Sequence, residues 1–133
     1  ILPTDRLQRA HCRSICGEMH SGFSSLRSSL PMNIKAHFPN FRVWSKAQAD
    51  IARIKDIWQE CLDAYGGPFL FGKFSMADAM YAPVVTRFRT YDVQLDDELS
   101  SYMDLIWTHP FMQEWIAAAR QEADDFEELE VEF

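Results

Sequence analysis

The sequence predicts an all-α fold, a five-helix bundle of which one helix is central, capped and buried. Three observations lead to it: apolar residues recur every three to five positions, capping residues and prolines mark the ends of these segments, and β-hairpin signals are missing. The 133 residues include only five glycines, no Asn-Gly or Asp-Gly pair, and no sustained apolar/polar alternation. We expect one helical domain over residues 1–133.

The first helix is predicted from Asp5 to about Leu30, with Thr4 or Asp5 as its N-cap. Pro31 ends it, because proline cannot continue a helix. Residues 31–44 then form a long loop, and loops of this length inside a compact domain are often functional. The apolar positions of the helix keep to one side: Leu7, Cys12, Ile15, Cys16, Met19, Phe23, Leu26 and Leu30.

The second and third helices each begin with residues spaced as in a capping box. Ser45-Lys46-Ala47-Gln48 precedes a helix that stops at Gly66-Gly67-Pro68, and Ser75 with Asp78 precedes the apolar segment 79–85. A helix that is apolar all round is expected to be wholly buried. Its cap must be satisfied by its own side chains, so we assign Ser75 and Asp78 to structure rather than to catalysis.

The last two helices are predicted on either side of Thr108-His109-Pro110. The fourth starts near Asp96, and the fifth has Thr108 or His109 as its cap. Residues 122–133 form an acidic tail with seven acidic residues among twelve, which accounts for the whole net charge of −7. We expect this tail to be a solvated terminus.

Composition narrows the possible partners and the compartment. An acidic balance and a pI near 5.0 argue against nucleic acid or an anionic membrane surface. No apolar run approaches the roughly 18 to 20 residues of a spanning helix. An odd number of cysteines fits reduced thiols better than disulfides. We therefore predict a cytoplasmic protein with no nucleic-acid or membrane partner.

The residues around the third helix carry a resemblance to a known family. The segment GPFLFGKFSMADA at 67–79 resembles the folding signature of the C-terminal helical domain of cytosolic glutathione S-transferases. The resemblance extends over essentially the whole chain, and Leu2-Pro3 looks like the end of the linker that follows the family's thioredoxin-like domain. It implies a thioredoxin-like N-terminal domain that is absent from this chain, so this chain alone is expected to be inactive.

A finer resemblance lies in EMHSGF at 18–23, which is similar to the ELHKGF stretch of bacterial beta-class enzymes. It implies His20 as a polar contact at the glutathione sulfur and Phe23 as a wall of the co-substrate pocket. Ser21 replaces a lysine that contacts glutathione in that class. Arg87-Phe88 similarly resembles an RW pair, which implies Phe88 at the pocket.

The spacing of His20, Phe23 and Arg27 would place them on one face of a continuous helix. His20 or Arg27 there could favour a thiolate or orient an acidic substrate group. The alternatives are that His20 is an ordinary interhelical histidine and Arg27 a surface residue. A zinc site on Cys12, Cys16 and His20 is disfavoured, because a third ligand two turns away cannot converge on one tetrahedron. We expect no metal.

The resemblance implies a glutathione transferase as the full-length protein, with glutathione as co-substrate. The chain would supply the hydrophobic half of the cleft and dimer contacts, in a homodimer that conjugates or isomerises small hydrophobic electrophiles. A non-catalytic protein-interaction module of the same fold is the alternative, and an unrelated helical bundle is a third possibility. We predict no catalytic residue within this chain.

Overall fold

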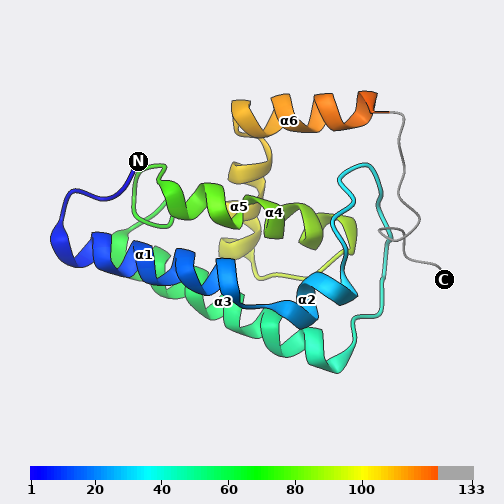
Figure 1. Cartoon of the computed structure of the whole chain (residues 1–133), viewed down its shortest axis with the longest axis horizontal. Helices are drawn as coiled ribbons and strands as arrows, with labels where there is room; N and C mark the ends of the chain where they lie inside the picture. The colour runs from blue at the N-terminus through cyan, green and yellow to red at the C-terminus, as the bar shows by residue number, and fades with distance from the viewer. Residues whose placement is uncertain (123–133) are drawn as a thin grey trace.

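The computed structural model describes residues 1–122, and the regular structure of this part is helical. The predicted all-α fold is confirmed, with six helices in place of the expected five: α1 (Arg6–Ser21), α2 (Ser24–Ser29), α3 (Ser45–Tyr65), α4 (Met76–Thr90), α5 (Asp97–Trp107) and α6 (Pro110–Gln121) (Figure 1). The acidic tail beyond Glu122 lies outside the described residues.

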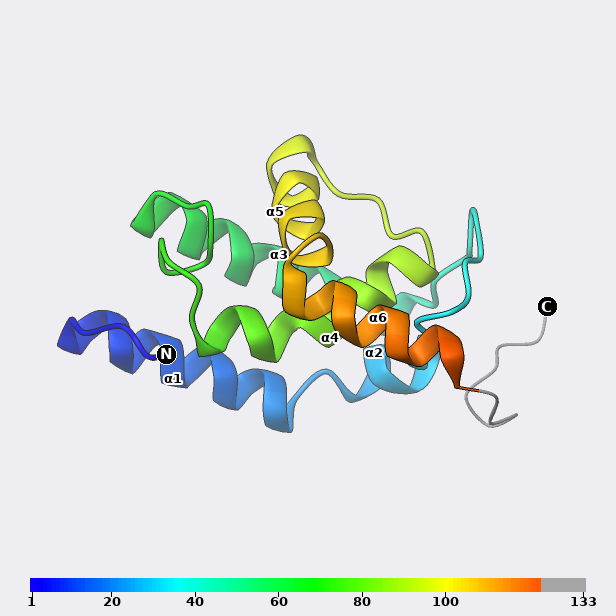
Figure 2. The same ribbon diagram turned by 90° about the horizontal axis from the view of Figure 1, so that it is seen from above.

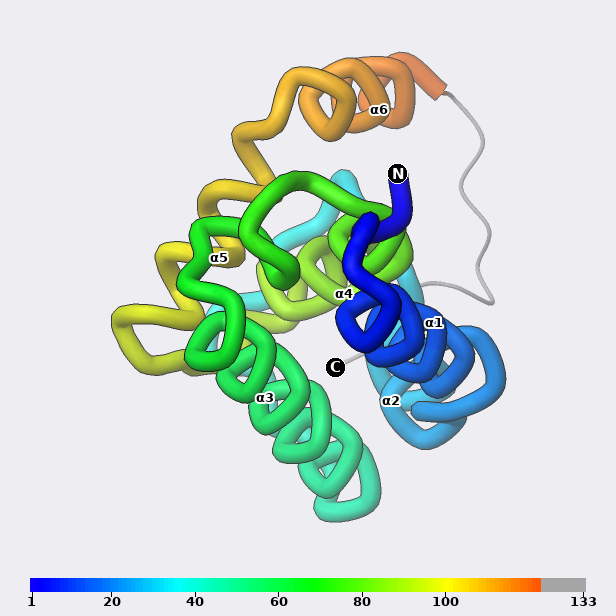
Figure 3. Tube along the Cα trace, turned by 90° about the vertical axis from the view of Figure 1, so that its left-hand side faces the viewer, coloured from blue at the N-terminus to red at the C-terminus, as the bar shows by residue number. Residues whose placement is uncertain are grey.

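Helix α4 is the centre of the arrangement (Figure 3). It packs against α1 and α5, while α3 packs against α2 and α5. Helix α6 packs against α5 and runs toward the end of the molecule where the 31–44 loop lies (Figure 2). The core between these helices contains a cluster of aromatic rings around Trp58 of α3. The centroid of the Trp58 ring lies 6.2 Å from that of Tyr81, 5.5 Å from that of Phe88 and 5.0 Å from that of Tyr102.

The predicted continuous first helix is wrong, because it breaks into α1 and α2. Gly22 is extended, and a Cβ atom there would lie 2.6 Å from the Glu18 carbonyl oxygen. Phe23 then takes a left-handed conformation with φ of 59°. Helix α3 stabilises the second piece, since the Asp50 carboxylate accepts a hydrogen bond from Leu26 N at 2.9 Å. The predicted N-cap, Asp5, is confirmed.

The capping box predicted at Ser45 is also wrong. Helix α3 already includes Ser45, and Trp44 occupies the cap position without a side-chain hydrogen bond. The Gln48 side-chain amide reaches back past the cap and donates to the Val43 carbonyl oxygen at 3.1 Å. The end predicted at Gly66 is confirmed, with this glycine in the left-handed region at φ of 81°.

The capping box of Ser75 and Asp78 is confirmed, and it does more than cap α4. The buried Asp78 carboxylate accepts from Ser75 N at 2.9 Å and from Leu70 N at 3.1 Å. It also accepts from the Tyr102 hydroxyl of α5 at 2.9 Å. Burial outweighs these hydrogen bonds and raises the pKa of the Asp78 carboxyl. One side chain thus joins the start of α4 to the preceding turn and to α5.

Helix α4 is central but not wholly buried, which corrects the prediction from its composition. Tyr81, Val84 and Phe88 face the core. Met76 is 37% exposed and Ala79 is exposed, so the first turns present an apolar edge to solvent. The start predicted near Asp96 is confirmed, with Asp96 as the N-cap of α5, and the cap predicted at His109 is confirmed for α6.

Replacing Asp78 by Ala should lower the free energy of unfolding by about 3 kcal/mol or more, because three buried donors lose their acceptor at once. Thermal and urea denaturation measure the change. Asp96→Ala is the matched control: it removes a helix cap with one hydrogen bond, to Leu99 N at 3.0 Å, and should cost about 1 kcal/mol. Equal losses in the two variants would contradict the wider role of Asp78.

Candidate functional site

The end of α4 holds the 31–44 loop in place. The Thr90 hydroxyl donates to the Asn33 carbonyl at 2.8 Å, and the Tyr91 hydroxyl donates to the Pro31 carbonyl at 2.7 Å. The half-buried Arg87 guanidinium donates to the Leu30 carbonyl, and burial lowers its pKa. The sequence indicated that the loop could be functional. It did not predict these hydrogen bonds, because their donors lie far away in the chain and leave no pattern in the loop's own sequence.

His20 lies exposed on the last turn of α1, immediately before the break. The neighbouring Ser21 hydroxyl donates to the Gly17 carbonyl at 2.9 Å, so it continues the hydrogen bonding of the helix. Glu18, one turn earlier, joins α1 to α3 through Arg53, whose Nε and Nη2 donate to its two carboxylate oxygens at 2.8 and 2.9 Å. These hydrogen bonds lower the pKa of Glu18. The ion pair fixes the end of α1 from which His20 projects.

The other two residues predicted beside His20 belong to different surroundings, because the helix break removes their common face. Phe23 is only 7% exposed and is part of the hydrophobic core. Arg27 is exposed, and its Nη2 returns to the Gly22 carbonyl at 2.7 Å. His20 and Arg27 therefore flank the α1–α2 junction, while Phe23 anchors it from inside.

Phe88 lies deepest of the four predicted site residues. Its side chain is completely buried and contacts Trp58 in the core, with 5.5 Å between ring centroids. In this structure it supports the end of α4 from within, and contact with a co-substrate stays a prediction.

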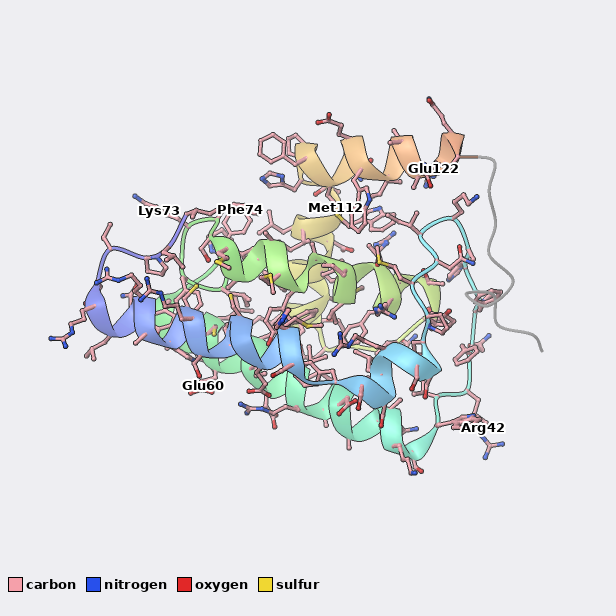
Figure 4. All side chains as sticks on the ribbon, in the orientation of Figure 1. Arg42, Glu60, Lys73, Phe74, Met112 and Glu122 are labelled. Carbon is pink, nitrogen blue, oxygen red and sulfur yellow. The ribbon has the colours of Figure 1, made fainter. Side chains whose placement is uncertain are left out.

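Sequence reasoning missed a surface formed by four rings, which we call the aromatic patch: Phe69, Phe74, His109 and Phe111. His109 stacks on Phe74 at 4.8 Å between centroids, and Phe69 meets Phe74 edge-on at 5.6 Å. Phe111 is 73% exposed and Phe74 is 37% exposed. Figure 4 shows Phe74 beside the start of α4, near α6. Clustered exposed aromatics mark surfaces that other molecules or domains cover.

Phe111 is the residue of this patch that lies on α6. The sequence has Phe111, Trp115, Ile116 and Ala119 as the spaced apolar residues of this helix, but the buried residues of α6 are Met112 and Ile116. Periodicity alone cannot say which side of a short helix packs inward when apolar residues occupy more than one side.

The three thiols lie inside the bundle. Cys12, Cys16 and Cys61 are all buried and free, which confirms Cys12 and Cys16 as small core residues. Burial raises the pKa of Cys16 to about 12, with Cys12 adding to the effect, and burial likewise raises the pKa of Cys61 to about 12. Within residues 1–122, no group of three or more His, Cys, Asp or Glu side chains could hold a metal ion.

Comparison with known protein families identifies the family to which this helical arrangement belongs. The family model described as glutathione S-transferase, C-terminal domain matches residues 42–118. The chain belongs to this family. No curated protein matches the chain.

The family match supports only those parts of the glutathione S-transferase resemblance that lie within residues 42–118. It covers α3, α4, α5 and most of α6, including the Asp78 capping box and Phe88. His20, Phe23 and Arg27 precede it, so their roles in binding remain predictions. None of the helices among residues 1–122 has the length and apolar content needed to cross a bilayer.

The break between α1 and α2 depends on Gly22, and substitutions of Gly22 and of Gly17 inside α1 test this. Gly22→Ala should destabilise the protein by about 1–3 kcal/mol, because the new methyl group would overlap the Glu18 carbonyl. Gly17→Ala, where a Cβ atom meets nothing within 4 Å, should stabilise the helix by about 0.5–1 kcal/mol. Chemical denaturation measures both. Stabilisation by both substitutions would show that the break is not enforced at Gly22.

The thiols should be unreactive in the native state. With a pKa of about 12, Cys16 and Cys61 are ionised to roughly one part in ten thousand at pH 8, and burial blocks access as well. Iodoacetamide at pH 8 should leave these two cysteines unmodified over hours, while all three should react within minutes in 6 M guanidinium. Mass spectrometry of the native protein measures the labelling. Rapid modification of Cys16 or Cys61 would contradict their buried placement.

Proposed function

We propose that this chain acts as the helical C-terminal half of a glutathione transferase of bacterial type, closest in motif to the beta class. Membership of the glutathione S-transferase C-terminal family carries the proposal. In this role the chain supplies the hydrophobic co-substrate side of a cleft and dimer contacts. Glutathione is the co-substrate, and the reaction is the conjugation or isomerisation of small hydrophobic electrophiles by a cytoplasmic homodimer.

A thioredoxin-like domain completes the cleft in this proposal, and two features support it. The aromatic patch and the exposed edge of α4 at Met76 form an apolar surface that a second domain would cover. The Ile1 carbonyl accepts a hydrogen bond from Met76 N at 2.8 Å, so a domain joined to Ile1 would emerge beside this surface. Glutathione would be held mainly by that domain.

The junction of α1 and α2 is proposed to face the thiol. A glutathione transferase must ionise a thiol whose usual pKa is near 8.5, and a hydrogen-bond donor or cation beside the sulfur favours the thiolate. His20 is exposed there and Arg27 is a nearby cation, while Phe23 and Phe88 form the apolar support behind the pocket. The chain's own residues thus assist the thiolate and hold the electrophile, and none is proposed as the nucleophile.

The alternative is a non-catalytic interaction module, which the aromatic patch favours. In that role the patch would bind a partner protein directly. The two functions differ in whether the protein binds glutathione at all.

The deciding experiment uses the natural protein that carries this chain. Retention on immobilised glutathione and conjugation of a chloronitrobenzene should both be measurable, and His20→Ala should lower kcat/KM about tenfold, the effect of one lost hydrogen bond to a charged group. Arg13→Ala is the control, because Arg13 is also exposed on α1 but lies two turns earlier. It should retain the activity of the natural protein.

Circular dichroism separates a folded inactive protein from a misfolded one. A folded protein without glutathione retention or conjugation would overturn the transferase proposal and favour the interaction module. Equal loss of activity in His20→Ala and Arg13→Ala would remove His20 from the site without affecting the transferase proposal.

A further inference from the structure

A cavity of about 370 Å³ lies between residues 34–37 of the long loop, the end of α4, α5 and α6. This volume falls within the range of small-ligand sites. Of the four predicted site residues, Phe88 lines it, and His20, Phe23 and Arg27 do not. The residues that do line it divide into an apolar group and a cationic group, and each group restricts what the cavity can hold.

The apolar group comes from the helices. Met103 and Trp107 of α5 line the cavity together with Val93 after α4 and the buried Phe88. Trp107 contributes an indole ring with the Arg89 guanidinium over it, at one turn's distance from Met103, which is a polarisable and adaptable side chain. This combination suits an aromatic or short acyl group.

The cationic group comes from three different elements: Lys35 of the loop, Arg89 of α4 and Arg120 of α6. Asp92 is the single carboxylate among the lining residues, and its Oδ2 accepts a hydrogen bond from Asn40 N at 3.0 Å. The cavity therefore has a net positive lining in a chain whose net charge is −7. Such a local excess attracts anions.

Arg89 is already oriented for recognition. Its guanidinium carbon lies 4.4 Å from the centre of the Trp107 ring, and its Nη1 donates to the Asp104 carboxylate at 3.3 Å. A guanidinium held on both sides loses little further freedom when it binds, and its planar fork matches a carboxylate. The stack also puts the cation directly beside the apolar surface.

We propose that this cavity binds a small organic acid, with its carboxylate on Arg89 and Arg120 and its apolar group against Trp107 and Met103. The proposal does not depend on transferase activity, because it concerns equilibrium binding at residues outside the α1–α2 junction.

The carboxylate that occupies this cavity can come from two sources, a free organic acid or an acidic side chain of the protein itself. Lys35 Nζ donates to the Glu122 carbonyl at 3.2 Å, so the chain passes the rim of the cavity at this residue. The sequence after Glu122 contains six acidic residues, with three large apolar residues between them and Phe133 after the last, so it again places carboxylates beside apolar groups. A test has to separate these sources.

Calorimetric titration of the natural protein with 2-naphthoate tests the site, with 2-naphthylmethanol as the neutral probe of the same shape. The acid should bind at least tenfold more tightly than the alcohol, and more weakly as salt rises. Arg120→Gln should weaken the acid about tenfold, the effect of one lost charged hydrogen bond. Arg13→Gln removes the same charge from exposed α1 and should leave the affinity unchanged.

A second protein, with Asp124→Asn, Asp125→Asn, Glu127→Gln and Glu128→Gln, identifies the source. Equal binding of naphthoate by both proteins assigns the site to a free acid, and binding that appears or strengthens on neutralisation assigns it to the chain's own carboxylates. Both results support a carboxylate site. Absence of saturable binding in both proteins, equal affinity for acid and alcohol, or equal losses in Arg120→Gln and Arg13→Gln would overturn it.

Discussion

The Asp78 carboxylate is the constraint on which the rest of the structure depends. An ionisable group without exposure is costly unless donors surround it, and here the donors come from three segments: the turn at Leu70, the cap at Ser75 and α5 at Tyr102. Burying this group thus requires the turn and α5 to occupy fixed positions relative to α4. A local helix cap becomes a long-range organiser because its second carboxylate oxygen serves other elements.

The opposite end of α4 supplies hydrogen-bond donors to carbonyl groups at the start of the proline-containing loop. Proline offers no N–H and interrupts regular pairing, so the carbonyls of Leu30 and Pro31 take donors from elsewhere, and the Asn33 carbonyl, which accepts from Ala36 N at 3.3 Å, takes a second one. Arg87, Tyr91 and Thr90 provide them. The order of a 14-residue loop therefore follows from α4, and the loop in turn completes the cavity beside Lys35.

The sequence predicted those features whose signals are local. The caps at Asp5, Ser75 and His109 and the start of α5 near Asp96 follow from residue type and spacing, and the all-α fold follows from periodicity. The α1–α2 break was not predicted because the apolar periodicity continues through Gly22. The feature that marks the break is the close approach of Gly22 to the Glu18 carbonyl oxygen, and periodicity does not show such a contact. The aromatic patch and the cavity escaped because each joins elements distant in sequence, and only tertiary packing brings them together.

The two ends of α4 support surfaces of opposite chemistry. Its first turn, at Met76, borders the apolar aromatic patch, while its last turn contributes Arg89 to the cationic cavity. Both surfaces rest on the same buried residues, Tyr81 and Phe88 among them, so a core substitution would disturb both together. Exposed Phe111 of the aromatic patch and exposed Arg120 of the cavity are not part of that core, and their substitution acts on one surface at a time. The binding properties of the two ends are thereby separable although their stability is shared.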